Sequence, residues 1–179
     1  PGDSFHSFKN IVKITSGSNN KTSKKINNLY KSIFKNTHKT DSIIIAESAK
    51  VIENIQRDLN IALVNELSII LDKMNVDTKK VIEAAGTKWN FQKFYPGLVG
   101  GHCISVDPYY LTYIAKLNNY NPKVILAGRK INNHMKYEVV KKLLKAIKNN
   151  KIKTKKAKIL VMGISFKENV SDLRNSQAL

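Results

Sequence analysis

The sequence is poor in the residues that build disulfides and metal centres. It holds one cysteine, Cys103, and four histidines in 179 residues. A single thiol cannot close an internal disulfide, and histidine and cysteine are too few and too scattered for a structural zinc site. We therefore predict no metal centre, and a reducing cytoplasm is the compartment that this cysteine usage favours.

Long apolar runs are also missing. None approaches the roughly 18 residues expected of a membrane-spanning helix. The polar start, Pro1-Gly2-Asp3-Ser4, does not resemble a secretory signal. With 42% hydrophobic residues, the chain is expected to be soluble and globular, with one or two domains and no membrane partner.

Acidic residues are scarce: 13 Asp and Glu face 31 Lys and Arg, which leaves a net charge of +18. Such a charge is compatible with nucleic-acid binding through phosphate contacts. However, base reading and bidentate phosphate clamps favour guanidinium groups, and the only arginines are Arg57, Arg129 and Arg174. A basic helical dimerisation or nucleic-acid-binding module is kept as an alternative, whereas a small phosphate-bearing ligand fits the charge equally well.

Glycine and proline are absent from residues 43–74. Within this stretch apolar residues recur at helical spacing. They are Ile52, Ile55, Leu59, Ala62, Leu63, Leu67, Ile70, Leu71 and Met74. The pattern predicts one helix of about 48 Å, at about 1.5 Å per residue, with a continuous apolar face. We expect so long a helix to pack against a partner subunit or to link two lobes.

Shorter elements are predicted on both sides of this helix. Before it, residues 10–15 form a strand, residues 22–35 a helix and residues 36–42 a polar separator. After it, helices are predicted over residues 78–85, 109–118 and 122–148.

Two further features are predicted near these helices. Asp107 is expected to be the N-cap of the helix that begins with Pro108. Residues 158–167 are typical of a buried parallel strand that runs into a glycine turn, the opening of a nucleotide-binding α/β unit.

The most informative stretch is residues 96–108, PGLVGGHCISVDP. Three glycines precede Cys103, and Asp107 follows it by four positions. Glycines allow positive φ and a close approach of the backbone to a ligand. The stretch is therefore a candidate reaction centre, although the same pattern fits a small, buried apolar thiol beside a turn.

Five segments occur in the order of a known enzyme family. They are AESAKVIEN (46–54), NEL (65–67), GTKWNF (86–91), the cysteine loop (96–108) and GISFKENVSDLRNS (163–176). Together they resemble the UDP-glucose/GDP-mannose dehydrogenases, most closely the UDP-N-acetylhexosamine 6-dehydrogenase branch. A lone glycine-rich loop would not support this, but five ordered motifs do.

The resemblance implies a fold class and a division of the chain. Members have two Rossmann-like domains around a central helical dimerisation domain. We therefore expect a mainly α chain: residues 1–42 end an NAD-binding domain, 43–150 form the central domain and 151–179 begin a UDP-binding domain. No Gly-x-Gly-x-x-Gly fingerprint precedes the first predicted strand, so most of the NAD-binding half is expected to lie outside this chain.

The resemblance also implies a reaction. Members oxidise the C6 alcohol of a UDP-sugar to a carboxylate with two molecules of NAD, here for surface polysaccharide such as capsule or O-antigen, and pair as homodimers through the central helices. Cys103 matches the nucleophile that forms a thiohemiacetal and then a thioester. We expect the 179 residues alone to be inactive.

Three further residues match catalytic positions. Lys50 and Asn54 lie at i and i+4, which places both side chains on one helix face. In the family such a pair holds the oxygen that becomes negative and helps to position water. Without the resemblance, the pair would fit a solvated face. Asp107 matches an acidic residue that engages the water or the lysine, a role compatible with an N-cap.

Other positions match ligand contacts. For the UDP-sugar they are Phe94, Tyr95, Gly97, Gly100, Phe166 and Lys167. Arg174 matches an NAD contact, although a surface arginine would fit as well. UDP-glucose dehydrogenases carry a small residue and a lysine where this chain has His102 and Val106, which favours the hexosamine branch. His102 fits either a general base for the thiol or a packing role.

Overall fold

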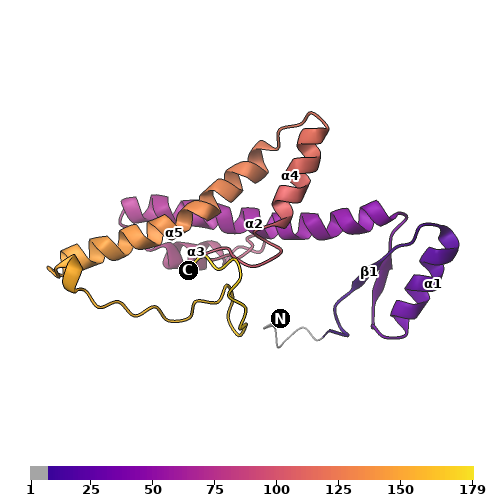
Figure 1. Ribbon diagram of the computed structural model, residues 1–179, viewed down its shortest axis with the longest axis horizontal. Coiled ribbons are helices and arrows are strands. Elements are labelled where there is room, and N and C mark those ends of the chain that lie inside the picture. Colours follow the sequence, from indigo (N-terminus) through magenta and orange to yellow (C-terminus); the bar gives the residue numbers. More distant parts are fainter. Residues whose placement is uncertain (1–7) are drawn as a thin grey trace. The chain divides into compact units, whose positions relative to one another are not determined.

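A computed structural model describes residues 8–179 of the chain. Their contacts divide them into two compact units, which meet within the long helix between Glu53 and Asn54. The described part is mainly helical, as predicted; it contains five α-helices and one two-stranded sheet (Figure 1). None of these helices is both long and apolar enough to cross a membrane. The predicted three-part division into domains stays a prediction.

The first unit is a small β-α-β arrangement. Strand β1 (Lys13–Thr15) pairs in parallel with β2 (Thr37–Lys39), and α1 (Asn20–Lys31) connects them. The Asn19 side chain caps α1 by accepting a hydrogen bond from the Thr22 N–H at 2.9 Å. Strand β1 and helix α1 are shorter than expected. Strand β2 lies within the predicted polar separator. It was not predicted because its three residues are polar and show no apolar alternation.

The long helix forms as predicted. Helix α2 spans Ile43–Lys73 without interruption. Its buried face differs from the predicted one, because only Ile55 and Ala62 of the apolar set are buried, whereas the other buried positions include Asn54, Asp58, Asn65 and Ser68. Most of the apolar set is exposed instead: Ile52, Leu63, Leu67, Ile70 and Met74.

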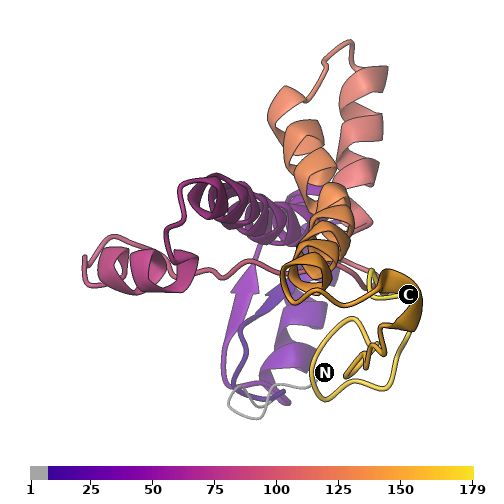
Figure 2. The same ribbon diagram turned by 90° about the vertical axis from the view of Figure 1, so that its left-hand side faces the viewer.

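The remaining helices belong to the second unit. Helix α3 (Thr78–Ala85) is capped by Asp77, whose Oδ1 accepts from the backbone N–H groups of Lys79 and Lys80. Helices α4 (Asp107–Leu117) and α5 (Lys123–Asn149) pack as a hairpin (Figure 2). Gly128 of α5 faces α2 so closely that a Cβ there would lie 2.5 Å from Leu59 Cδ2.

The predicted strand over residues 158–167 does not form. This segment follows a short 3-10 helix (Thr154–Lys156) and has no regular structure, and Leu160 and Met162 are 83% and 88% exposed. A strand needs a neighbour to pair with, and among residues 8–179 the only strands, β1 and β2, pair with each other. Residues 158–167 thus have the apolar pattern of a strand, but residues 8–179 provide no further strand with which they pair.

Candidate active site

Cys103 lies in the loop that leads into α4, and it is exposed. Its carbonyl oxygen accepts hydrogen bonds from the N–H groups of Val106 and Asp107, at 3.1 and 2.8 Å. This turn joins the thiol residue directly to the carboxylate residue. Among the described residues the thiol is thus not a buried apolar side chain.

Asp107 and Asn54 meet although 53 positions separate them. Asn54 Nδ2 donates to Asp107 Oδ2 at 2.6 Å, and Asn54 is 1% exposed. The predicted N-cap role of Asp107 is wrong: helix α4 begins at Asp107, Val106 holds the cap position and no side chain caps the helix. The Asp107 carboxylate binds the buried amide of α2 instead.

Lys50 lies one helical turn before Asn54 on α2, but it belongs to the other compact unit. Its Nζ forms an ion pair with Glu53 Oε2 at 2.9 Å, and both side chains are more than half exposed. The structure therefore brings two of the predicted catalytic residues, Asn54 and Asp107, into contact and keeps Lys50 on the same helix as Asn54.

The glycine loop packs against the last segment of the chain. Gly101 has φ +89°, and a Cβ there would lie 2.8 Å from the Phe166 ring. A Cβ on Gly100 would lie 2.5 Å from the Asn175 carbonyl oxygen. The Gly101 N–H donates to that oxygen at 3.3 Å. These two glycines are needed because any side chain would push the segments apart.

His102 contacts the same segment. Its Nε2 lies 2.8 Å from Asp172 Oδ2, and its ring meets the Phe166 ring edge-on. Asp172 also accepts from the Arg174 guanidinium and backbone N–H. Hydrogen bonds from Arg174, and a weaker contribution from His102, hold the pKa of the Asp172 carboxyl well below its usual range. This geometry favours a packing role for His102.

The predicted ligand contacts lie around this loop. Phe94 is partly buried, whereas Tyr95 and Lys167 are exposed. Arg174 is 76% exposed while it holds Asp172. The Gly97 backbone is already bonded to Asn65: its N–H donates to Asn65 Oδ1 at 2.8 Å, and its carbonyl oxygen accepts from Asn65 Nδ2 at 3.0 Å.

A buried polar cluster beneath the loop escaped prediction. Arg129 of α5 donates from Nη1 to Asp58 Oδ1 of α2 at 2.6 Å, and the two side chains are 3% and 0% exposed. Asn132 Nδ2 donates to the same oxygen at 2.7 Å. Burial raises the pKa of the Asp58 carboxyl, and the charge of Arg129 and the hydrogen bonds oppose this.

Two features of the sequence weakly indicate this cluster. Arg129 is one of only three arginines in a chain whose other basic residues are lysines. Gly128, Arg129, Asn132 and Met135 form the buried face of α5, at the spacing of a helix. A search for apolar periodicity overlooks such a face because two of its members are polar.

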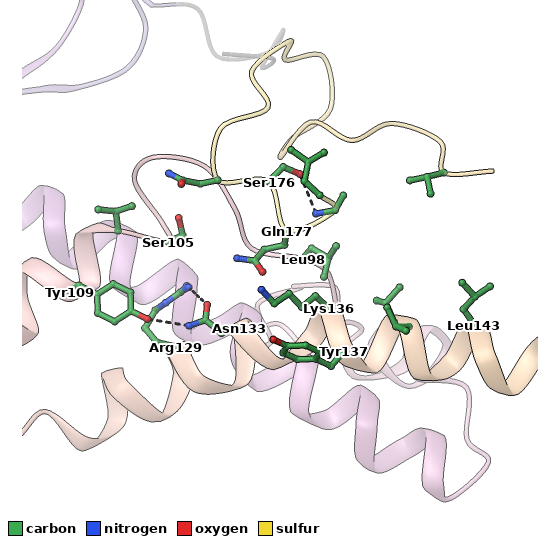
Figure 3. Close-up of a pocket in the computed structure, with 17 residues that line it drawn as sticks. Leu98, Ser105, Tyr109, Arg129, Asn133, Lys136, Tyr137, Leu143, Ser176 and Gln177 are labelled. Carbon is green, nitrogen blue, oxygen red and sulfur yellow. Dashed lines mark hydrogen bonds between the residues drawn. The ribbon is translucent and has the colours of Figure 1, made fainter. Parts of the chain in front are cut away.

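A cavity of about 840 Å³ lies behind the loop in the second unit (Figure 3). Leu98, Ser105 and Tyr109 border it, together with α5 and the end of the chain. Asn133 donates to Tyr109 Oη and accepts from Arg129 Nη2, which ties one wall to the polar cluster (Figure 3). Cys103 is not among the residues that line this cavity. Within residues 8–179, no group of three His, Cys, Asp or Glu side chains could hold a metal ion.

Comparison with known proteins adds to this geometry. Over residues 45–134 the chain matches the central domain of the UDP-glucose/GDP-mannose dehydrogenase family. It is 53% identical to a UDP-N-acetyl-D-glucosamine 6-dehydrogenase of Pseudomonas aeruginosa, over all of this chain and 43% of that protein. It is 48% identical to protein CapL of Staphylococcus aureus, over all of this chain and 42% of that protein.

A solved structure agrees. The UDP-D-ManNAc dehydrogenase of Pyrococcus horikoshii superposes with a TM-score of 0.86 and 34% identity, over 94% of this chain and 40% of that one. The chain thus spans less than half the length of the relatives it matches. The predicted resemblance is confirmed, and the chain belongs to the UDP-glucose/GDP-mannose dehydrogenase family.

Proposed function

We propose that this chain is the central part of a UDP-N-acetylhexosamine 6-dehydrogenase. The observation that carries the proposal is the exposed thiol of Cys103, whose turn places Asp107 against the buried amide of Asn54. The relatives at 48–53% identity include two named UDP-N-acetyl-D-glucosamine 6-dehydrogenase. The basic nucleic-acid module considered from the net charge is not favoured, since the charge alone supports it.

Cys103 serves as the nucleophile in this proposal. The C6 alcohol first loses a hydride and its hydroxyl proton, which gives an aldehyde. The Cys103 thiolate then adds to the aldehyde carbon: the C–S bond forms, the π bond of the carbonyl breaks, and its oxygen takes up a proton, which gives a thiohemiacetal. Loss of a second hydride and of this hydroxyl proton converts it to a thioester. Water attacks the thioester carbon, the C–S bond breaks, and the carboxylate and the thiol are released.

Polar residues beside the thiol stabilise the charge that develops. The oxygen on the former aldehyde carbon becomes negative when sulfur or water attacks, and donors already in place stabilise it without reorganisation. Asn54 is such a donor, because its burial and its bond to Asp107 hold it still. Asp107 accepts a proton from the attacking water, and Lys50 adds a positive charge on the same helix.

The UDP-sugar binds beside the glycine loop. Phe94 and Tyr95 offer rings to the base, while the backbone of Gly97 and Gly100 shapes the loop that surrounds the diphosphate. Phe166 packs on Gly101, which places the neighbouring Lys167 close to the loop as a cation for the diphosphate. A product of this kind would serve surface polysaccharide synthesis.

NAD is the electron acceptor implied by the family, and when bound it takes up the two hydrides. This chain offers one candidate contact, Arg174, whose exposed guanidinium fits a single phosphate or ribose contact while it holds Asp172. The sequence contains no Gly-x-Gly-x-x-Gly. We therefore expect the 179 residues alone to reduce little or no NAD.

A hybrid enzyme tests the proposal. The 180 aligned residues of the Pseudomonas relative are replaced by this chain, and NAD reduction with UDP-N-acetylglucosamine is followed. We expect two NAD reduced per sugar. Cys103→Ala should abolish turnover and keep UDP affinity within about twofold, because the thiol acts only in chemistry. Full turnover by this variant would refute the covalent route.

The exposed apolar residues of α2 support a homodimer. Leu63, Leu67 and Ile70 are large, apolar and exposed on consecutive turns. We expect light scattering to give twice the chain mass and Leu67→Lys to give the single mass. A monomeric wild-type chain would contradict this part of the proposal.

A further inference from the structure

Asn65 of α2 holds the glycine loop by both backbone groups of one residue. Its Oδ1 accepts from the Gly97 N–H at 2.8 Å, and its Nδ2 donates to the Gly97 carbonyl oxygen at 3.0 Å. Two antiparallel hydrogen bonds of this kind imitate a strand pairing, so they fix the position and the orientation of the peptide units around Gly97.

The orientation of the Asn65 amide is itself determined by the cluster below it. Asn132 Nδ2 donates to the Asp58 backbone oxygen at 2.9 Å and to Asp58 Oδ1 at 2.7 Å. These acceptors force Asn132 Oδ1 to face away, and there it accepts from Asn65 Nδ2 at 2.8 Å. Because the nitrogen of Asn65 is thus committed, its oxygen faces the Gly97 N–H.

Burial makes this arrangement rigid. Asn65, Asn132 and Asp58 are at most 1% exposed, so water does not compete for their hydrogen bonds. A flipped amide would set two oxygens against each other inside the core, which is costly in a medium of low dielectric constant. Arg129 anchors the far end through Asp58 Oδ1. The loop is therefore held by four side chains in series, Arg129, Asp58, Asn132 and Asn65, which come alternately from α5 and α2.

We propose that Asn65 is a positioning residue for nucleotide binding, and that Asn132 acts through it. This inference rests on the proposed function, because it takes the loop around Gly97 as the surface that receives the UDP group. Asn65 does not act on the reacting atoms. It holds the backbone in the conformation to which the nucleotide binds, so its loss weakens binding and leaves the chemical step intact.

Amide exchange tests the contact without any enzyme assay. In the wild-type 179-residue chain, NMR should show the Gly97 N–H exchanging as slowly as the core amides of α2. Gly163, an exposed glycine in the irregular last segment, is the fast reference. A Gly97 amide as fast as that of Gly163 overturns the proposal, whatever any variant does.

Two variants test the direction of the effect. Asn65→Asp keeps the shape of the side chain and places an oxygen against the Gly97 carbonyl. Asn132→Ala removes one of the two acceptors of Asn65 Nδ2 without changing any residue of the loop. Both should release the Gly97 amide while the α2 amides stay slow. Asn150→Asp, at the exposed end of α5, makes the same chemical change as Asn65→Asp. In this variant the Gly97 amide and the α2 amides should all keep their slow exchange.

The hybrid enzyme gives the functional outcome. Asn65→Asp should weaken UDP binding about tenfold, the effect of one lost hydrogen-bond contact, and raise KM while kcat at saturation changes less than about twofold. A free Gly97 amide with unchanged UDP affinity overturns the proposal. The proposed covalent function is judged separately, by the activity of Cys103→Ala, so the two can fail independently.

Discussion

Arg129 and Asp58 form a buried ion pair between α5 and α2, with Nη1 and Oδ1 2.6 Å apart. Neither group is fully satisfied by protein: Asp58 Oδ2 and Arg129 Nε are buried among the described residues without a hydrogen-bond partner. Removing such a pair from water costs free energy, which the mutual attraction of the two charges offsets only where the geometry is good and the remaining groups are hydrogen-bonded. The pair forms the end of the polar cluster that lies farthest from Gly97 in the series of hydrogen bonds.

Removal of the cation should therefore be costly. Arg129→Met leaves the Asp58 carboxyl buried without its counter-charge, and we expect the free energy of unfolding to fall by about 3–5 kcal/mol. Denaturant unfolding followed by circular dichroism measures it. Lys130 is the exposed neighbour, and Lys130→Met makes the same change of charge. Its free energy of unfolding should lie within about 0.5 kcal/mol of the wild-type value. Equal losses in both variants would contradict the structural assignment.

The contact between Asn54 and Asp107 is also open to test. Asp107→Asn keeps the shape but removes the charged acceptor of a buried amide, so the free energy of unfolding should fall by about 1.5–3 kcal/mol. In the hybrid enzyme we expect kcat to fall at least about tenfold, since Asp107 no longer accepts a proton. A variant with wild-type kcat would remove Asp107 from the catalytic group.

Two glycines of the same loop should respond differently to alanine. Gly101→Ala forces a side chain into positive φ and against the Phe166 ring, and should cost about 1–2 kcal/mol of stability. Gly97→Ala is the matched control, because a Cβ at that position would meet no atom within 4 Å. Thermal unfolding of both variants measures the difference. Similar melting temperatures would show that the loop does not pack on Phe166.

Acid should loosen the contact of the last segment with the loop. The pKa of Asp172 is lowered in the folded chain, chiefly by its bonds to Arg174, from an ordinary value of 3.8. The stabilisation is therefore complete above this value and is lost as the pH falls below it. NMR shifts of the Gly101 amide should stay unchanged as the pH falls through this ordinary value and should change only at lower pH, where the folded-state carboxyl takes up its proton.

A variant isolates that carboxyl. Asp172→Asn should remove the acid-dependent shift of the Gly101 amide, because the side chain no longer ionises. Asp41→Asn, an exposed aspartate in the other unit, is the control for the change in charge. An acid-dependent shift that survives in Asp172→Asn would place its origin elsewhere.

Much of this fold follows from local pattern. The apolar spacing over residues 43–74 predicted the ends of α2 to within one residue, and the helix predicted over residues 78–85 has the bounds of α3. Residues 158–167 show the limit, since a parallel strand depends on a partner that lies elsewhere in sequence. The same applies to Asp107, which resembles an N-cap but bonds to Asn54 across the fold.

The candidate site was predictable only where a residue type carries its own chemistry. Cys103 stands out because it is the one thiol in the sequence. The cluster of Asp58, Asn65, Arg129 and Asn132 does not, because amides and charges on a helix are usually solvated. Their burial results from how α2 and α5 pack, which hydrophobic periodicity does not report.

The continuity of α2 has a mechanical consequence. Lys50 and Asn54 belong to different compact units, yet one uninterrupted helix carries both. Their axial separation is therefore set by helical rise alone, about 6 Å, and their angular offset by helical twist. The uninterrupted helix therefore holds the two side chains on the same helix face. One residue inserted between them would turn Lys50 away by about 100° and uncouple the pair.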